Sequence, residues 1–189
     1  MTVDGLLLAH GAGGGAEHHL FHALDAALAP MPVHRMEFPY RKAGRKAPDR
    51  APKLVATVVE EATDFAKRIG TTPDRLVLGG RSMGGRMCSM AVAEGLPAAG
   101  LVLMSYPLHP PGKAEKLRVD HFDQIRVPCL FVGGDRDPFG SPAEFEMHTS
   151  VVDGPVTHVW LEGQRHDPRP SFDGHVVAAV AEWLSGLRD

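Results

Sequence analysis

The sequence is poor in cysteine, in aromatic residues and in long apolar runs. Among its 189 residues are 2 cysteines, Cys88 and Cys129, and only 6% aromatic side chains. Two distant cysteines without metal-ligand spacing indicate no disulfide framework, so we expect a reducing, cytoplasmic location. No stretch approaches the roughly 18 apolar residues of a membrane span, and the first residues lack the basic region of a secretory signal. We therefore expect no membrane partner.

An excess of charge of one sign is also missing. The chain carries 20 basic and 23 acidic side chains, which gives a formal net charge of −3. A dedicated nucleic-acid-binding domain usually presents a strongly basic face, so we expect no nucleic-acid partner. The hydrophobic content of 43% and the charged content of 23% are typical of a globular chain. At this length, residues 1–189 are expected to form a single domain.

Short apolar runs alternate with segments of helical periodicity along the chain. The runs predict strands over residues 6–9, 33–38, 75–79, 100–104, 127–132 and 156–161. Helical spacing predicts helices over residues 17–29, 53–69, 82–94, from 141 onward, and along a last stripe that ends at 187. Because each parallel strand needs a crossover that packs on the sheet, the alternation predicts an α/β class, doubly wound, six-stranded parallel sheet. Ligands bind such sheets beyond the carboxyl ends of the strands.

The turn after the third predicted strand holds a serine between two glycines. Residues 80–84 read Gly-Arg-Ser-Met-Gly, follow an apolar run directly and open a helix. A nucleophilic serine needs a sharp turn, and glycines two residues before and after it let the backbone pack closely. A glycine-rich turn with an incidental helix-capping serine would match the same letters. The strand before Ser82 and the helix after it favour the nucleophile.

A serine hydroxyl is a weak nucleophile until a base removes its proton and an acid orients that base. On a sheet of this kind the chain order is serine, acid, histidine. Asp135 and Asp137 follow the fifth predicted strand, and His166 follows the sixth. We favour Asp137 as the acid because Asp135 lies closer to the strand end, and Asp135 stays open as an alternative. A solvated loop histidine is the simpler interpretation of His166, but three placements at strand ends predict that the side chains converge.

The glycine loop at residues 11–16 has two interpretations. It matches G-x-G-x-x-G/A after a strand, and Glu37 follows it 21 residues later, as in a dinucleotide-binding fingerprint. In a hydrolase, a loop of this kind after a histidine such as His10 supplies one backbone N–H to an oxyanion hole, and the residue after the serine supplies the other. Those donors would be the amides of Ala12 and Met83. The serine turn elsewhere in the chain favours the hydrolase, so we expect no cofactor.

Two further features predict less chemistry. His18 and His22 lie one helical turn apart, but no third ligand has suitable spacing, so we expect no metal. Residues 41–53 hold six basic side chains and one acid, which would suit an anionic substrate or a solvated flexible loop equally well. Arg81 and Arg86 flank the serine turn and could extend a positive rim.

Four segments together carry a resemblance to a known family. Residues 10–14, 38–40, 80–86 and 134–140 resemble the α/β-hydrolase superfamily. More narrowly, they are similar to its small, lid-less group related to dienelactone hydrolases, which also includes a scaffold subunit of a histone-acetyltransferase complex. The resemblance covers nearly the whole chain.

The resemblance implies Ser82 as nucleophile, Asp137 as acid through its Asp-Pro step, and His166 as base. It also implies a minimal α/β-hydrolase fold without a lid, with strand order 2-1-3-4-5-6, since only 22 residues separate Met104 from Val127. The expected activity is that of a carboxylesterase- or thioesterase-like serine hydrolase. Its substrate would be a small ester or thioester, cleaved through an acyl-enzyme intermediate. The scaffold relative leaves a non-catalytic binding or scaffold module as the alternative, and the oligomeric state stays open.

Overall fold

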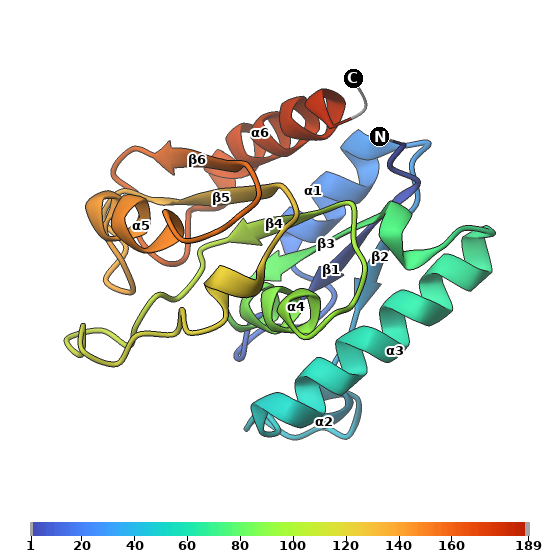
Figure 1. Ribbon diagram of the computed structural model, residues 1–189, viewed down its shortest axis with the longest axis horizontal. Coiled ribbons are helices and arrows are strands. Elements are labelled where there is room, and N and C mark those ends of the chain that lie inside the picture. Colours follow the sequence, from blue (N-terminus) through green and yellow to red (C-terminus); the bar gives the residue numbers. More distant parts are fainter. Residues whose placement is uncertain (1, 188–189) are drawn as a thin grey trace.

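An open, twisted parallel sheet forms the middle layer of the molecule (Figure 1). The computed structural model describes residues 2–187. The strands are β1 (Gly5–Ala9), β2 (Val33–Met36), β3 (Leu76–Arg81), β4 (Gly100–Met104), β5 (Cys129–Gly134) and β6 (Val156–Leu161). Their order is β2-β1-β3-β4-β5-β6, and every neighbouring pair is parallel. The predicted fold class and strand order are therefore confirmed.

Helices connect the strands on both faces of the sheet. They are α1 (His19–Leu28), α2 (Pro39–Lys42), α3 (Ala51–Ile69), α4 (Met83–Ala93), α5 (Pro142–Thr149) and α6 (Asp173–Gly186), with single 3-10 turns at Pro73–Arg75, Phe122–Gln124 and Pro170–Phe172. Helix α3 ends at Gly70, whose φ of 73° lies in the left-handed region that glycine adopts readily. Among residues 2–187, no helix has the length and apolar character needed to cross a bilayer.

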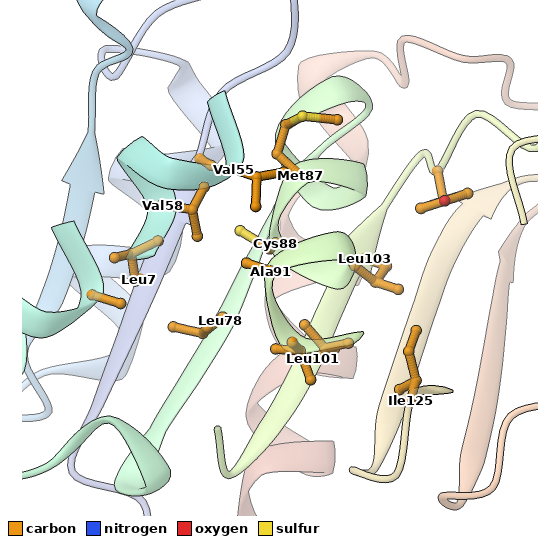
Figure 2. Packing of buried hydrophobic residues seen from close by; sticks show 14 of the residues in the cluster. Leu7, Val55, Val58, Leu78, Met87, Cys88, Ala91, Leu101, Leu103 and Ile125 are labelled. Carbon is orange, nitrogen blue, oxygen red and sulfur yellow. The ribbon is translucent and has the colours of Figure 1, made fainter. Parts of the chain in front are cut away.

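Two apolar layers flank the sheet and explain why its central strands are buried. Figure 2 shows Val58 of α3 and Met87 of α4 above Leu78 of β3, on the face that these two helices cover. On the opposite face, α1 and α6 contribute Phe21 and Val180 to a second apolar cluster. Every residue of β1 and of β4 is buried, as expected for parallel strands that are covered on both sides.

The basic segment at residues 41–53 has regular structure over much of its length. Helix α2 includes its first two residues, and α3 begins at Ala51, before the predicted start at 53. Between the helices, the Asp49 carboxylate pairs with Arg45 and Lys53 at 3.0 and 3.3 Å. Residues 43–50 are the irregular part of this segment, and the Asp49 carboxylate links basic side chains on both sides of it.

The order of the strands places the first and second glycine turns side by side. Ala9, the last residue of β1, is paired in register with Gly80 of β3. Because β2 lies on one side of β1 and β3 on the other, the strand order reverses here, which is where such sheets bind ligands. A Cβ atom on Gly84 would overlap the Ala9 carbonyl oxygen and lie 2.7 Å from that of His10. Glycine at this position therefore allows α4 to begin directly against β1.

Candidate active site

Ser82 lies at the junction of β3 and α4 in a conformation that few residues adopt. Its φ is 51° and its ψ is −115°, a strained combination for a residue with a side chain, which costs on the order of 1–3 kcal/mol. The Ser82 N–H donates to the Met104 carbonyl at the end of β4, 2.8 Å away, and this bond fixes the turn against the sheet. Strain of this kind is expected where a turn must raise a side chain above the strand ends.

The structure brings the three predicted side chains together. Ser82 Oγ lies 2.8 Å from His166 Nε2, and His166 Nδ1 lies 2.8 Å from Asp137 Oδ2. An ionised carboxylate only accepts hydrogen bonds, so Nδ1 carries the ring proton and Nε2 is left to accept the proton of the serine hydroxyl. The Asp137 side chain is 3% exposed, and its other oxygen accepts a hydrogen bond from the Phe139 N–H at 2.9 Å.

Asp135, the alternative acid, has a different environment. Its Oδ1 accepts a hydrogen bond from the Gly163 N–H at 2.7 Å, in the turn that follows β6. That turn leads to His166, so Asp135 braces the loop that carries the histidine. A Cβ atom on Gly134 would overlap the Gln164 carbonyl oxygen, so the loops after β5 and β6 approach closely there. This close approach explains how the acid and the histidine meet.

The loop after β1 is held by two buried aromatic side chains. His10 is 1% exposed; its Nδ1 donates to the Gly11 carbonyl at 2.8 Å, and its Nε2 accepts from the Phe38 N–H at 3.1 Å. Burial lowers the pKa of His10, which keeps the ring neutral and able to accept. The Tyr40 hydroxyl donates to the Ala12 carbonyl at 2.9 Å. Ala12 is thereby fixed beside the serine turn.

A cleft of about 670 Å³ opens over the serine. It is lined by residues 11–14, His18, the 81–83 turn, Arg86, Pro107, Arg118, Phe139 and residues 166–167. Both predicted oxyanion-hole residues, Ala12 and Met83, lie on its wall with Ser82. Sequence reasoning missed Arg118 and gave Phe139 no role of its own. Arg118 lies in an irregular connection where no pattern marks it.

Arg81 joins the serine turn to the histidine loop. Its Nη2 donates to the His166 carbonyl at 3.1 Å and pairs with Asp167 Oδ1 at 2.7 Å. The Arg81 side chain is 13% exposed, so this pair is partly shielded from water. The positive rim expected from Arg81 is therefore neutralised on this side of the cleft.

The glycine loop, His18 and His22 have local structural roles. Helix α1 begins at His19, so the glycine loop does not open directly into a helix N-terminus as a dinucleotide fingerprint requires. His18 caps α1 by accepting from the Leu20 N–H, and His22 pairs with Glu17 at 2.8 Å. Within residues 2–187, no group of three or more metal-binding side chains is arranged around one point.

A serine turn at the reversal point of a parallel sheet, covered by helices on both faces, is the arrangement of α/β hydrolases. A family model described as an alpha/beta hydrolase domain matches residues 3–177. The chain therefore belongs to this family. Residues 105–128, where larger members insert a lid, contain a single 3-10 turn as regular structure.

Known proteins are similar to this chain in part or in fold. Epoxide hydrolase A of Mycobacterium tuberculosis is 35% identical over 63 residues, which are 33% of this chain and only 20% of that protein. The monoacylglycerol lipase of Paleococcus ferrophilus shares the fold with a TM-score of 0.73 and 15% identity, over 98% of this chain and 96% of that one. The type II thioesterase BorB from the borrelidin biosynthetic cluster shares the fold with a TM-score of 0.70 and 20% identity, over 97% of this chain and 93% of that one.

Proposed function

We propose that this protein is a serine hydrolase that cleaves a small ester or thioester through an acyl-enzyme intermediate. The observation that carries the proposal is the continuous hydrogen-bonded chain from Ser82 through His166 to Asp137, with both distances at 2.8 Å. Each of these residues follows a different strand, and all three meet beside the cleft. A strained serine supports the same reaction, because backbone strain concentrates at functional sites.

The geometry fits a two-step acyl transfer. Ser82 Oγ attacks the carbonyl carbon while its proton passes to Nε2 of His166, and Asp137 stabilises the imidazolium that forms. The oxyanion accepts hydrogen bonds from the amides of Ala12 and Met83. His166 then returns the proton to the leaving oxygen or sulfur. In the second step, water gives its proton to His166 and attacks the acyl carbon, which releases the acid and restores the serine.

The open cleft supports a small substrate rather than a long lipid. It is formed by loops at the strand ends and has no covering domain within residues 2–187, so water has direct access for the second step. The fold is shared with a lipase, which acts on an oxygen ester, and with a thioesterase. Both leaving groups fit the mechanism, since His166 can protonate either atom.

A fluorophosphonate probe tests the proposal directly. We expect one covalent adduct per wild-type chain by intact mass, located at Ser82, and none in Ser82→Ala. Ser185→Ala is the matched control, because this exposed serine at the end of α6 should label like wild type. A folded wild-type protein that neither labels nor hydrolyses short 4-nitrophenyl esters and thioesters would favour the scaffold alternative.

A further inference from the structure

Two arginines on the cleft wall carry charges that no described carboxylate neutralises. Arg86 is in α4, one turn after Ser82, and Arg118 is in the connection between β4 and β5. Within residues 2–187 neither guanidinium takes part in an ion pair, whereas Arg81 in the same cleft is paired with Asp167. Among the described residues, the buried Nε atom of Arg86 has no hydrogen-bond partner. A buried polar group without a partner in a native fold calls for an explanation.

The buried titratable side chains beside the two arginines are neutral, and the exposed carboxylates that act on His121, Asp120 and Asp123, form no ion pair with either arginine within residues 2–187. Burial, with the Arg86 charge next, lowers the pKa of His121 to about 4, so this ring is uncharged near neutral pH. It bonds Ser89 Oγ at 2.8 Å. Burial raises the pKa of the Tyr106 phenol, which lies within the field of both arginines and also stays neutral. None of these neutral groups supplies a counter-charge.

The two guanidinium groups also repel each other. Burial lowers the pKa of Arg118, and the like charge of Arg86 lowers it further. Two like charges on one cleft wall are unfavourable by themselves, and a bound anion offsets their repulsion. The arrangement therefore suits a negatively charged ligand better than a neutral one.

We propose that Arg86 and Arg118 form a subsite for an anionic group, a carboxylate or a phosphate, on the substrate. The inference rests on the proposed function, since it places this group on the ester that Ser82 attacks. A guanidinium binds either oxyanion through paired N–H donors. Four residues of helix separate Arg86 from Ser82 by about 6 Å along the axis. The charged group would thus lie a few bonds from the scissile carbonyl, as in a monoester of a six-carbon dicarboxylic acid.

Matched esters measure the preference. On the acyl side, 4-nitrophenyl hydrogen adipate is compared with the neutral 4-nitrophenyl adipamate. On the leaving-group side, 4-carboxyphenyl hexanoate is compared with 4-carbamoylphenyl hexanoate. In one of the two pairs we expect kcat/KM for the anionic ester to exceed that for the neutral ester by roughly 10- to 100-fold, the effect of one charged hydrogen-bonded contact. A ratio near one in both pairs overturns the proposal.

Substitutions assign the preference to the two arginines. In Arg118→Met and in Arg86→Met we expect the anionic-to-neutral ratio to fall by at least about tenfold, and Arg118→Lys to retain part of it. Arg126→Met is the matched control, because Arg126 is exposed, pairs with Asp153, and precedes the opposite end of β5. If the anionic-to-neutral ratio of kcat/KM is the same in Arg118→Met as in Arg126→Met and in wild type, the assignment is contradicted.

Direct binding separates this proposal from the proposed reaction. Calorimetric titration with adipate and with inorganic phosphate measures the subsite without turnover and distinguishes a carboxylate from a phosphate as its preferred anion. If the wild-type protein is inactive but binds one of these anions, and Arg118→Met loses that binding, the subsite proposal stands and the hydrolase proposal is refuted. If the wild-type protein is active but binds neither anion and prefers neither charged ester, the hydrolase proposal stands and the subsite proposal is refuted.

Discussion

The imidazole ring of His166 is stacked on the phenyl ring of Phe139, with the ring centroids 3.9 Å apart and the planes at 26°. The same short segment supplies Asp137, which binds the edge of the imidazole at Nδ1. The Phe139 N–H also donates to Asp137. Residues 137–139 therefore hold the histidine by its edge and by one face, and leave Nε2 directed at Ser82.

Replacing Phe139 tests whether this stacking positions the base. In Phe139→Leu we expect kcat for a 4-nitrophenyl ester to fall by about tenfold with a smaller change in KM, because the ring loses the surface that fixes its orientation. Phe172→Leu is the control, since Phe172 also packs on a histidine, His175, outside the cleft. Equal losses in both variants would show that a generic effect on stability is being measured.

We expect substitutions of the two aspartates after β5 to have very different effects on kcat. In Asp137→Asn the amide cannot stabilise an imidazolium and favours the wrong ring tautomer, so kcat should fall by about 10³- to 10⁴-fold. In Asp135→Asn the side-chain oxygen can still accept the Gly163 N–H, and we expect a change of only a few-fold. Steady-state kinetics on one ester measures both. The reverse ranking would transfer the acid role to Asp135.

Glycines and strand ends made much of the site predictable from the sequence. Gly80 and Gly84 flank Ser82 because backbone atoms occupy the space that a Cβ atom would fill at either position. The need for glycine at both positions is visible in the sequence as a motif. The alternation of elements predicted the parallel sheet, since parallel strands need crossovers, and the family resemblance implied the order of its strands. The side chains of Ser82, Asp137 and His166 could then be placed at one edge of the sheet from the sequence alone.

Element ends that depend on an unusual cap, and features that depend on tertiary contacts, were not predictable. Helix α1 begins at His19 rather than at residue 17 because the His18 ring caps it. The expected strand over 33–38 ends at Met36, and the Phe38 N–H bonds the buried His10 ring instead. Arg118 reaches the cleft through a connection whose course is set by contacts such as its N–H to the Leu108 carbonyl. No local pattern encodes such a return of the chain.

Gly84→Ala should destabilise the fold more than an ordinary glycine substitution. Its Cβ would overlap the Ala9 carbonyl oxygen, which is backbone and cannot turn aside, so we expect a loss of about 2–4 kcal/mol in the free energy of unfolding. Gly174→Ala in α6 has open space around the new methyl group and should stabilise by about 0.4–1 kcal/mol. Urea unfolding of both variants measures the difference. A tolerated alanine at 84 would contradict the close approach of α4 to β1.

His121 should make the fold less stable in mild acid. Its Nε2 bonds Ser89 Oγ at 2.8 Å, and burial together with the Arg86 charge lowers its pKa from 6.5 to about 4. The unfolded chain therefore binds a proton between these values that the folded chain does not. The contribution of His121 to stability is full above about pH 6.5 and is lost as the pH drops toward 4. Because the ring is partly exposed, we expect this histidine to contribute about 1–3 kcal/mol to the fall.

The comparison that isolates His121 is His121→Gln, whose amide can still donate to Ser89 but does not titrate. Burial also lowers the pKa of His10, so some loss of stability in acid should remain in this variant. Urea unfolding at about pH 7 and about pH 4.5 should show a smaller loss for His121→Gln than for wild type, by the amount given above. His175→Gln, at an exposed position of α6, should lose as much as wild type. Equal losses in wild type and His121→Gln would mean that the ring titrates normally, and that it does not lie in the field of an unneutralised Arg86.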